Sequence, residues 1–289
     1  MLQYTTDFSS RITMRFLPFL LLICTLQALA AEKPLVVVSV LPQETIVKRI
    51  AGDLVDVEVM VGKGFNPATY QPSPRQIARL SRAVLYVRAG MPFEQSWLPR
   101  FTAVNPAMKV LDMREGLKLL PALGHHAQDA DPHIWTDPEL VKQHAQRLRD
   151  RLDALFPAHK SRFDENYSRF AARLDALDRE LQTTLAPVRG ESFLVYHPAW
   201  SYFAHRYGLK QMAVEHEGKE PNPRSLTRLI ETAKRAHIHT ILVQPQHSAA
   251  TARVLADAIG AKLVQMDPLE ADIFSALRKL AAALTAQKS

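Results

Sequence analysis

The chain has 289 residues, of which 47% are hydrophobic, and a formal net charge of +7. This length and composition are ordinary for a folded protein with one large or two smaller domains, and they exclude wholesale disorder. Lys and Arg alternate with Asp and Glu along the predicted helices and form no basic stripe with interleaved aromatic residues, so we expect no nucleic-acid partner.

The first 30 residues have the pattern of a secretory signal peptide. Arg15 precedes the apolar run Phe16 to Leu26, and Ala28-Leu29-Ala30 is a small-residue cleavage site. The mature chain is therefore expected to begin near Ala31, after export to the periplasm. The apolar run has roughly 11 residues, against about 20 for a membrane-spanning helix, so we expect no stable membrane insertion of the mature chain.

Two residues of this segment affect how the N-terminus is interpreted. Asp7 fits poorly in the first part of a signal peptide, so translation from Met14 is an alternative to Met1. Cys24 is the only cysteine of the chain, and the bulky Ile23 before it argues against lipid modification. Once Cys24 is removed with the signal peptide, any metal site must use histidine and carboxylate side chains.

Eight short runs rich in β-branched residues follow, and helical patterns separate them. Ser73-Pro74 has the form of an N-cap and a first-turn proline, and Gly208 and Gly260 end helical segments. Continuous apolar strands between helices predict mainly parallel sheets that are covered on both faces. The predicted strands are Leu35 to Val40, Val55 to Val61, Ala83 to Val87, Lys109 to Met113, Phe193 to Tyr196, Gln211 to Glu215, Thr240 to Val243 and Lys262 to Met266.

The alternation of strands and helices is interrupted once, between Asp137 and Arg189. A first helical pattern ends before Pro157, and a second has apolar residues at spacings of three and four from Phe163 to Leu185. The second pattern predicts a helix of about 25 residues, about 37 Å long, that belongs to neither sheet. We therefore expect an N-terminal α/β lobe over residues 31–160, a linker helix over 161–188 and a C-terminal α/β lobe over 189–289.

Side chains that can bind a metal follow several of the predicted strands. His197, His247 and Asp267 come after strands of the second lobe, and His133 lies in a loop of the first. Each alone is more often structural, since a lone histidine is commonly hydrogen-bonded and Asp before Pro is commonly a turn residue. Because the carboxyl ends of parallel strands meet at one edge of a sheet, the set favours Zn²⁺ or another first-row divalent ion in a cleft between the lobes.

Four segments, in order along the chain, carry a resemblance to one family. They are Asn66-Pro67-Ala68-Thr69-Tyr70-Gln71-Pro72 for P-H-x-Y-E-P, Asp131-Pro132-His133-Ile134-Trp135 for D-P-H-x-W, His197-Pro198-Ala199-Trp200-Ser201-Tyr202-Phe203 for H-x-A-F-x-Y-F, and Met266-Asp267-Pro268-Leu269 for L-D-P-L. With these motifs the chain resembles the zinc- or manganese-type solute-binding proteins of bacterial ABC importers, also called cluster A-I or helical-backbone metal receptors. The resemblance extends from about Pro34 to Leu284.

This resemblance implies two α/β lobes joined by a long helix, with a metal ion held in the cleft between them. His133 would contribute from the first lobe, and His197 and Asp267 from the second. Histidine at position 197, where manganese-type members tend to have glutamate, favours Zn²⁺ over Mn²⁺ or another first-row divalent ion. The resemblance further implies a periplasmic, monomeric receptor that delivers its ion to an ABC-transporter permease, and not an enzyme.

The chain departs from the family at Ala68, which replaces the first histidine ligand and has no donor atom. His247, where the family usually has an aromatic or small residue, is one replacement for that fourth ligand. Water, His216 or His125 are others, and a change of cargo to another metal or a metal chelate is a third outcome. Three protein ligands plus water also describe catalytic zinc.

Two further function classes therefore stay open. A zinc-dependent hydrolase would need a general base, for which the sequence offers Glu215, Glu217 and Glu220 in one loop. A surface adhesion protein would need no bound ion at all.

Overall fold

The computed structural model describes Met1 and residues 32–123, 130–215, 218–247 and 249–286. The chain divides after Glu32, and the second unit, Lys33–Ser289, is compact and holds the helices and strands described below. The predicted signal peptide lies almost wholly outside the described residues. Along the described part of the chain, no helix is both long and apolar enough to cross a membrane.

The first sheet is parallel, with the strand order β2-β1-β3-β4. Its central strand β1 is buried at all six positions, as expected for a strand covered on both faces. The helices that alternate with its strands are α1 (Leu41–Ala51), α2 (Pro74–Leu80) and α3 (Pro92–Val104). The strands are β1 (Leu35–Val40), β2 (Asp56–Val61), β3 (Ala83–Arg88) and β4 (Lys109–Asp112).

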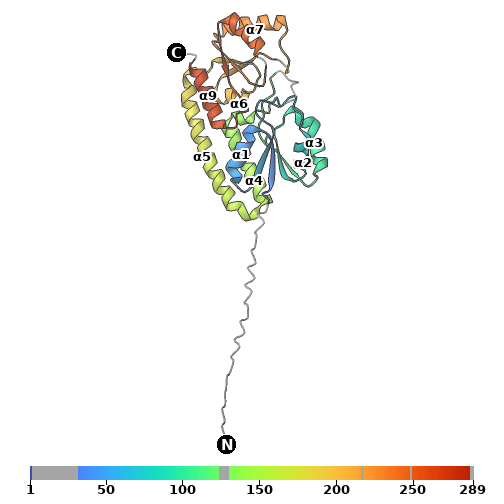
Figure 1. The fold of residues 1–289 in the computed structure, drawn as a ribbon. Helices are drawn as coiled ribbons and strands as arrows, with labels where there is room; N and C mark the ends of the chain where they lie inside the picture. Colours follow the sequence, from blue (N-terminus) through green and yellow to red (C-terminus); the bar gives the residue numbers. More distant parts are fainter. Residues whose placement is uncertain (2–31, 124–129, 216–217, 248, 287–289) are drawn as a thin grey trace. The chain divides into compact units, whose positions relative to one another are not determined.

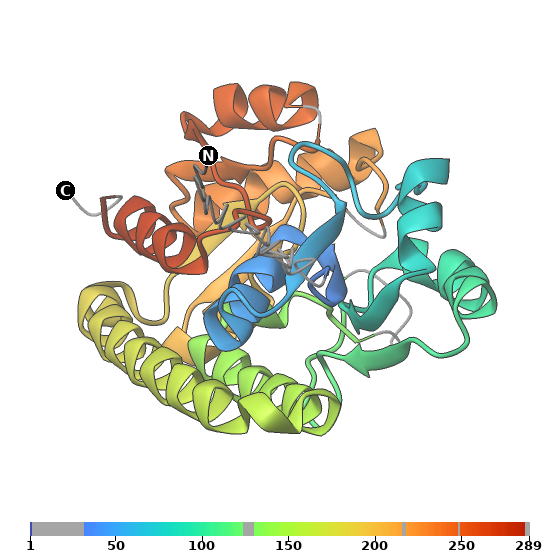
Figure 2. The same cartoon turned by 60° about the horizontal axis from the view of Figure 1, so that its bottom comes forward.

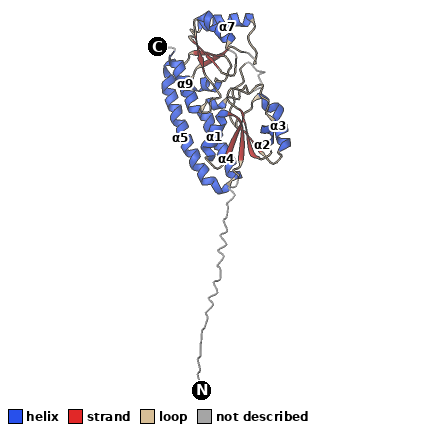
Figure 3. Cartoon of the chain, viewed as in Figure 1, coloured by secondary structure: helices blue, strands red, loops and turns tan. Residues whose placement is uncertain are grey.

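The second sheet is also parallel and repeats this arrangement with the order β6-β5-β7-β8. All eight predicted strands are present, with ends that differ from the prediction by at most two residues, which confirms the fold class of two parallel α/β sheets (Figure 3). The strands are β5 (Ser192–Val195), β6 (Lys210–Ala213), β7 (Thr240–Val243) and β8 (Lys262–Gln265), and the helices are α6 (Ser201–Tyr207), α7 (Pro223–Arg235), α8 (Ala250–Ile259) and α9 (Ile273–Thr285).

Two helices connect the sheets. Helix α4 (Pro138–Leu155) begins at the N-cap Asp137, whose carboxylate accepts the backbone N–H of Glu139, and α5 (Lys160–Leu185) follows with 26 residues. Figures 1 and 2 show α5 alongside α4, and α5 also contacts α1 and α9. Helix α5 therefore packs against elements of both lobes, as the prediction of one long joining helix required.

One of the two hydrophobic clusters formed by the described residues contains side chains of both lobes. Phe193 and Val195 of β5 belong to the same buried cluster as β1 and the inner face of α5, whereas the alternate residues Leu194 and Tyr196 pack with α7 and α8. This period of two places the opposite faces of β5 in different parts of the interior. Separating the lobes would expose apolar surface of the larger cluster, so they are not free to move about a bare linker.

Hydrogen bonds also cross between the lobes near the ends of the strands. The indole N–H of Trp135 donates to the carbonyl oxygen of Pro268 at 2.7 Å. The hydroxyl of Tyr202 donates to the carbonyl oxygen of Asp131 at 2.8 Å. Both contacts are buried, where an unpaired carbonyl or N–H is costly, so they fix the loop that carries residue 133 against the second lobe.

Candidate metal site

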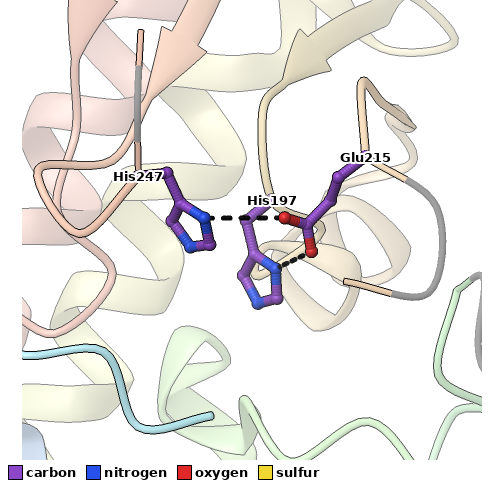
Figure 4. A group of neighbouring side chains, drawn as sticks. All are labelled: His197, Glu215 and His247. Carbon is purple, nitrogen blue, oxygen red and sulfur yellow. Dashed lines mark hydrogen bonds and ion pairs between the residues drawn. The ribbon is translucent and has the colours of Figure 1, made fainter. Parts of the chain in front are cut away.

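The candidate metal site forms where three neighbouring strands of the second sheet end. His197 comes two residues after β5, Glu215 two residues after β6, and His247 four residues after β7. Because β5 lies between β6 and β7, the three side chains meet, with one ligand atom of each lying within 4.8 Å of the others (Figure 4). This edge is where the sheet order reverses, the usual ligand position in open α/β proteins.

Hydrogen bonds fix both the backbone and the ring of His197. The side-chain amide of buried Gln244 accepts the N–H of His197 at 3.1 Å and donates to its carbonyl oxygen at 2.8 Å. The Nδ1 of the ring donates to Oε1 of Glu215 at 2.5 Å. With Nδ1 occupied, the Nε2 of His197 is the nitrogen left for a ligand.

His247 lies beside His197. The two rings are nearly parallel, with centroids 5.1 Å apart and an interplanar angle of 15°, and the other neighbour of His247 is the ring of Tyr196. The Nδ1 of His247 lies 3.5 Å from Oε2 of Glu215. Burial and the neighbouring His197 lower the pKa of His247, against the opposing effect of Glu215. A lowered pKa favours the neutral imidazole, which is the form that binds metals.

His133 brings a third imidazole from the first lobe. The carboxylate of Asp131 accepts both the backbone N–H of His133, at 2.9 Å, and its Nδ1–H, at 2.7 Å. Burial alone would raise the pKa of Asp131, but the contacts with His133 hold it below its ordinary value. The ring centroid of His133 is 5.3 Å from that of His197.

These ring separations suit a shared metal ion. With Zn–N bonds of about 2.1 Å and a tetrahedral angle, two imidazoles bound to one Zn²⁺ have centroids about 5.2 Å apart. The distances of 5.3 Å for His133 and His197 and 5.1 Å for His197 and His247 both agree with this value. By this measure the ring of His197 can share an ion with either neighbouring ring. Among the described residues, the group whose ligand atoms all lie within 4.8 Å of one another is His197, Glu215 and His247, and it includes neither His133 nor Asp267.

Asp267 follows β8, at the edge of the sheet. Its Oδ1 accepts the side-chain N–H of Gln246 at 2.8 Å and the backbone N–H of Leu269 at 2.9 Å. A carboxylate can keep two donors on one oxygen and offer the other to an ion. Its neighbours Gln246, Pro268 and Leu269 line the cavity described next.

A cavity of about 280 Å³ lies in front of these residues. Its lining includes Ala68, Arg114, His133, His197, Glu215 and His247, so both lobes contribute to it. The backbone N–H of Ala68 donates to the side chain of Asn66 at 2.8 Å, which fixes the local turn of the loop that contains Ala68. The volume exceeds that of one ion, and water can occupy the remainder.

Sequence reasoning gave Glu215 a different role, that of a general base. In the structure both of its oxygens face imidazole nitrogens, and Glu220 accepts the hydroxyl of Tyr196 at 3.2 Å and that of Thr251 at 2.9 Å. Gln244, which holds His197, was not predicted either. The alternative residues His125, His216 and Glu217 lie outside the described residues.

Comparisons with known proteins agree with this fold. The chain is 30% identical over 266 residues to the zinc-binding lipoprotein AdcA of Streptococcus pneumoniae, covering 86% of this chain but only 53% of AdcA, so it spans about half the length of that relative. It is 28% identical to the high-affinity zinc uptake system protein ZnuA of Bacillus subtilis, covering 83% of this chain and 79% of that protein. A crystal structure of a zinc-bound ZnuA deletion mutant superposes with a TM-score of 0.85 at 38% identity, covering 89% of this chain and 99% of the other.

Residues 36–286 match the sequence family described as zinc-uptake complex component A, periplasmic, or ZnuA. This family description agrees with the family resemblance predicted from the sequence motifs. The match covers nearly all of the second compact unit, including both sheets and the helices between them. The chain therefore belongs to the ZnuA family of periplasmic zinc-uptake components.

Proposed function

We propose that the chain is the periplasmic receptor of an ABC importer, which captures Zn²⁺ in the cleft and delivers it to a membrane permease. The observation that carries this proposal is the place of the His197 ring between those of His133 and His247, at distances from each that fit two imidazoles on one tetrahedral ion. Three imidazoles favour Zn²⁺ over Mn²⁺, which prefers oxygen ligands. The family, a zinc-uptake complex component, supports the same cargo and the permease partner.

The proposed ligands are His133, His197, Asp267 and His247. The first three match the family motifs, and His247 supplies the donor that Ala68 lacks. Ala68 and His247 line the same cavity, one from each lobe. Loss of a ligand in the first lobe would thus be compensated by a gain in the second, so that four donors remain around the ion.

Calorimetry on the metal-stripped mature protein tests this function. We expect about one Zn²⁺ per chain, because one cluster of imidazoles converges, and weaker binding of Mn²⁺ because the proposed set is rich in nitrogen. Thermal unfolding should shift upward when Zn²⁺ is added, since a ligand that binds only the folded state stabilises it. No uptake of either ion would contradict the proposal.

A rescue experiment tests the fourth ligand. His247→Ala is expected to weaken Zn²⁺ binding by about 10- to 100-fold or more, and Ala68→His in that background is expected to restore most of the loss. In the otherwise unmodified protein Ala68→His should change the affinity much less, because four donors are already present. If His247→Ala leaves the affinity unchanged while Ala68→His tightens binding, the compensation is wrong and the site is open.

A further inference from the structure

We propose that Glu215 is a positioning residue for the ion and not one of its ligands: its carboxylate holds the Nδ1 atoms of His197 and His247 together and so presents both Nε2 atoms to Zn²⁺. This inference rests on the proposed zinc-receptor function and adds a residue to it. The carboxylate of Glu215 lies next to two imidazoles, so its role determines whether the ion has an oxygen of Glu215 among its ligands.

The hydrogen-bond geometry divides the carboxylate between the two rings. Oε1 accepts the Nδ1–H of His197 at 2.5 Å, and Oε2 makes a longer electrostatic contact with the Nδ1 of His247 at 3.5 Å, beyond the 2.7–3.2 Å of an ordinary N–H···O hydrogen bond. Figure 4 shows one oxygen directed to each ring, with the second nitrogen of both rings on the side away from the carboxylate. Each oxygen thus has an imidazole partner, while each ring keeps a nitrogen for the ion.

The exposed fractions of the three side chains agree with a positioning role for Glu215 and a ligand role for the two histidines. The side chain of Glu215 is 5% exposed, whereas the side chains of His197 and His247 are 23% and 18% exposed. The carboxylate therefore lies behind the rings, and the rings lie nearer the open part of the cleft. A group behind its partners orients them more readily than it competes with them for the ion.

The first lobe shows the same arrangement around its single imidazole. Asp131, whose side chain is 2% exposed, holds the Nδ1 of His133 at 2.7 Å. Metal-binding histidines usually donate their other ring N–H to a carboxylate or carbonyl, which sets the tautomer. Asp131 contacts the Nδ1 of one ring, and Glu215 contacts the Nδ1 atoms of two. All three imidazoles would therefore present Nε2 to the ion.

This role makes a specific prediction for an isosteric change. A glutamate can accept an N–H from both rings, but a glutamine has one accepting oxygen and one NH₂ group that only donates. In Glu215→Gln, the oxygen can keep the Nδ1–H of His197, and the NH₂ group then favours His247 with an unprotonated Nδ1 and a protonated Nε2. A protonated Nε2 cannot bind the ion, so the variant should lose the ligand His247 while keeping its side chain.

The experiment is a double-mutant cycle on the full mature chain, with Zn²⁺ affinity and the visible spectrum of bound Co²⁺ as readouts. Glu215→Gln should weaken Zn²⁺ binding by about 10- to 100-fold in the unmodified protein and by less than about threefold in a His247→Ala background. The Co²⁺ spectrum of Glu215→Gln should match that of His247→Ala. Glu220→Gln, which removes the same charge from the same loop without touching an imidazole nitrogen, should change neither readout.

Equal losses in both backgrounds, or a Co²⁺ spectrum unlike that of His247→Ala, would overturn the inference and favour Glu215 as a direct ligand. An unchanged affinity in Glu215→Gln would overturn it as well. Thermal unfolding of the metal-free variants verifies that each one folds. If the unmodified protein binds neither Zn²⁺ nor Co²⁺, the receptor function itself fails, which is a distinguishable result.

Discussion

Replacing His197 with alanine is expected to weaken Zn²⁺ binding by about 100-fold or more. The four-ligand zinc sites of zinc-finger peptides are worth roughly 10–16 kcal/mol at pH 7, so an average ligand there contributes about 3 kcal/mol, or a factor of about 100 in affinity. His197 should contribute at least this much because its ring is the middle one of three, 5.3 Å from His133 and 5.1 Å from His247. Competition with a chromophoric chelator measures the change.

The Zn²⁺ affinity of His197→Ala should fall by more than the loss of one Zn–N bond alone would cause. Without the ring, Oε1 of Glu215 loses the hydrogen bond at 2.5 Å, and a buried carboxylate that loses a hydrogen bond is costly. The matched control is His205→Ala, which removes an exposed imidazole from α6. Equal Zn²⁺ affinities for His197→Ala and His205→Ala would show that the imidazole cluster is not the metal site.

The strands of this protein could be predicted from sequence, but their order could not. Each strand is a short apolar run between helical patterns, and β1 with its four valines is buried throughout. Nothing along the chain, however, states that β5 pairs with both β6 and β7. Register and neighbour choice depend on how helices pack over the sheets, which is a tertiary effect.

For that reason the histidines were predictable and their partners were not. His197 was found because it begins a motif and ends a strand, whereas Glu215 ends the next strand along the chain without any motif of its own. Its contact with two rings becomes visible only once β6 and β7 are placed on either side of β5. Glu215 was weighed only as a general base, because the partner of a carboxylate cannot be inferred from spacing alone.

Asp267 illustrates the opposite case, in which a motif identifies a residue whose surroundings need the structure. It follows β8, which pairs with β7, so it is two strands away from His197. Gln246, which comes directly before His247, donates to its Oδ1 at 2.8 Å. The loop after β7 therefore carries the candidate ligand His247 and, through Gln246, orients the candidate ligand Asp267, which follows β8.

Acidification is expected to destabilise the metal-free protein through His144. This residue lies on the inner face of α4 with an exposed fraction of 0%, as expected for a core position, and neither ring nitrogen has a hydrogen-bond partner among the described residues. Burial, followed by the charge of Arg147, lowers the pKa of His144 from 6.5 to about 3, while Asp112 acts in the opposite direction.

The sign of the effect follows from proton binding. Because the folded-state pKa is lower, the unfolded chain takes up the proton first, and stability falls as the pH drops below 6.5 toward 3. Well inside this window one such group changes the free energy of unfolding by up to about 1.4 kcal/mol per pH unit, or by about 2 kcal/mol in total between pH 6.5 and 4.5. Urea unfolding at a series of pH values, with chelator present, measures this slope.

His144→Leu provides the comparison, because leucine is a good helix former and has no proton to gain. The variant should be at least as stable as the unmodified protein at pH 7, since it replaces two unpaired buried nitrogens with apolar atoms. Below pH 6.5 the free energy of unfolding of this variant should decline less steeply than that of the unmodified protein, by about 1.4 kcal/mol per pH unit. The other titrating groups are the same in both proteins, so their contributions cancel when one profile is subtracted from the other. Parallel pH profiles for the two proteins would mean that His144 is already hydrated or paired when it is protonated, and that α4 opens before the protein unfolds.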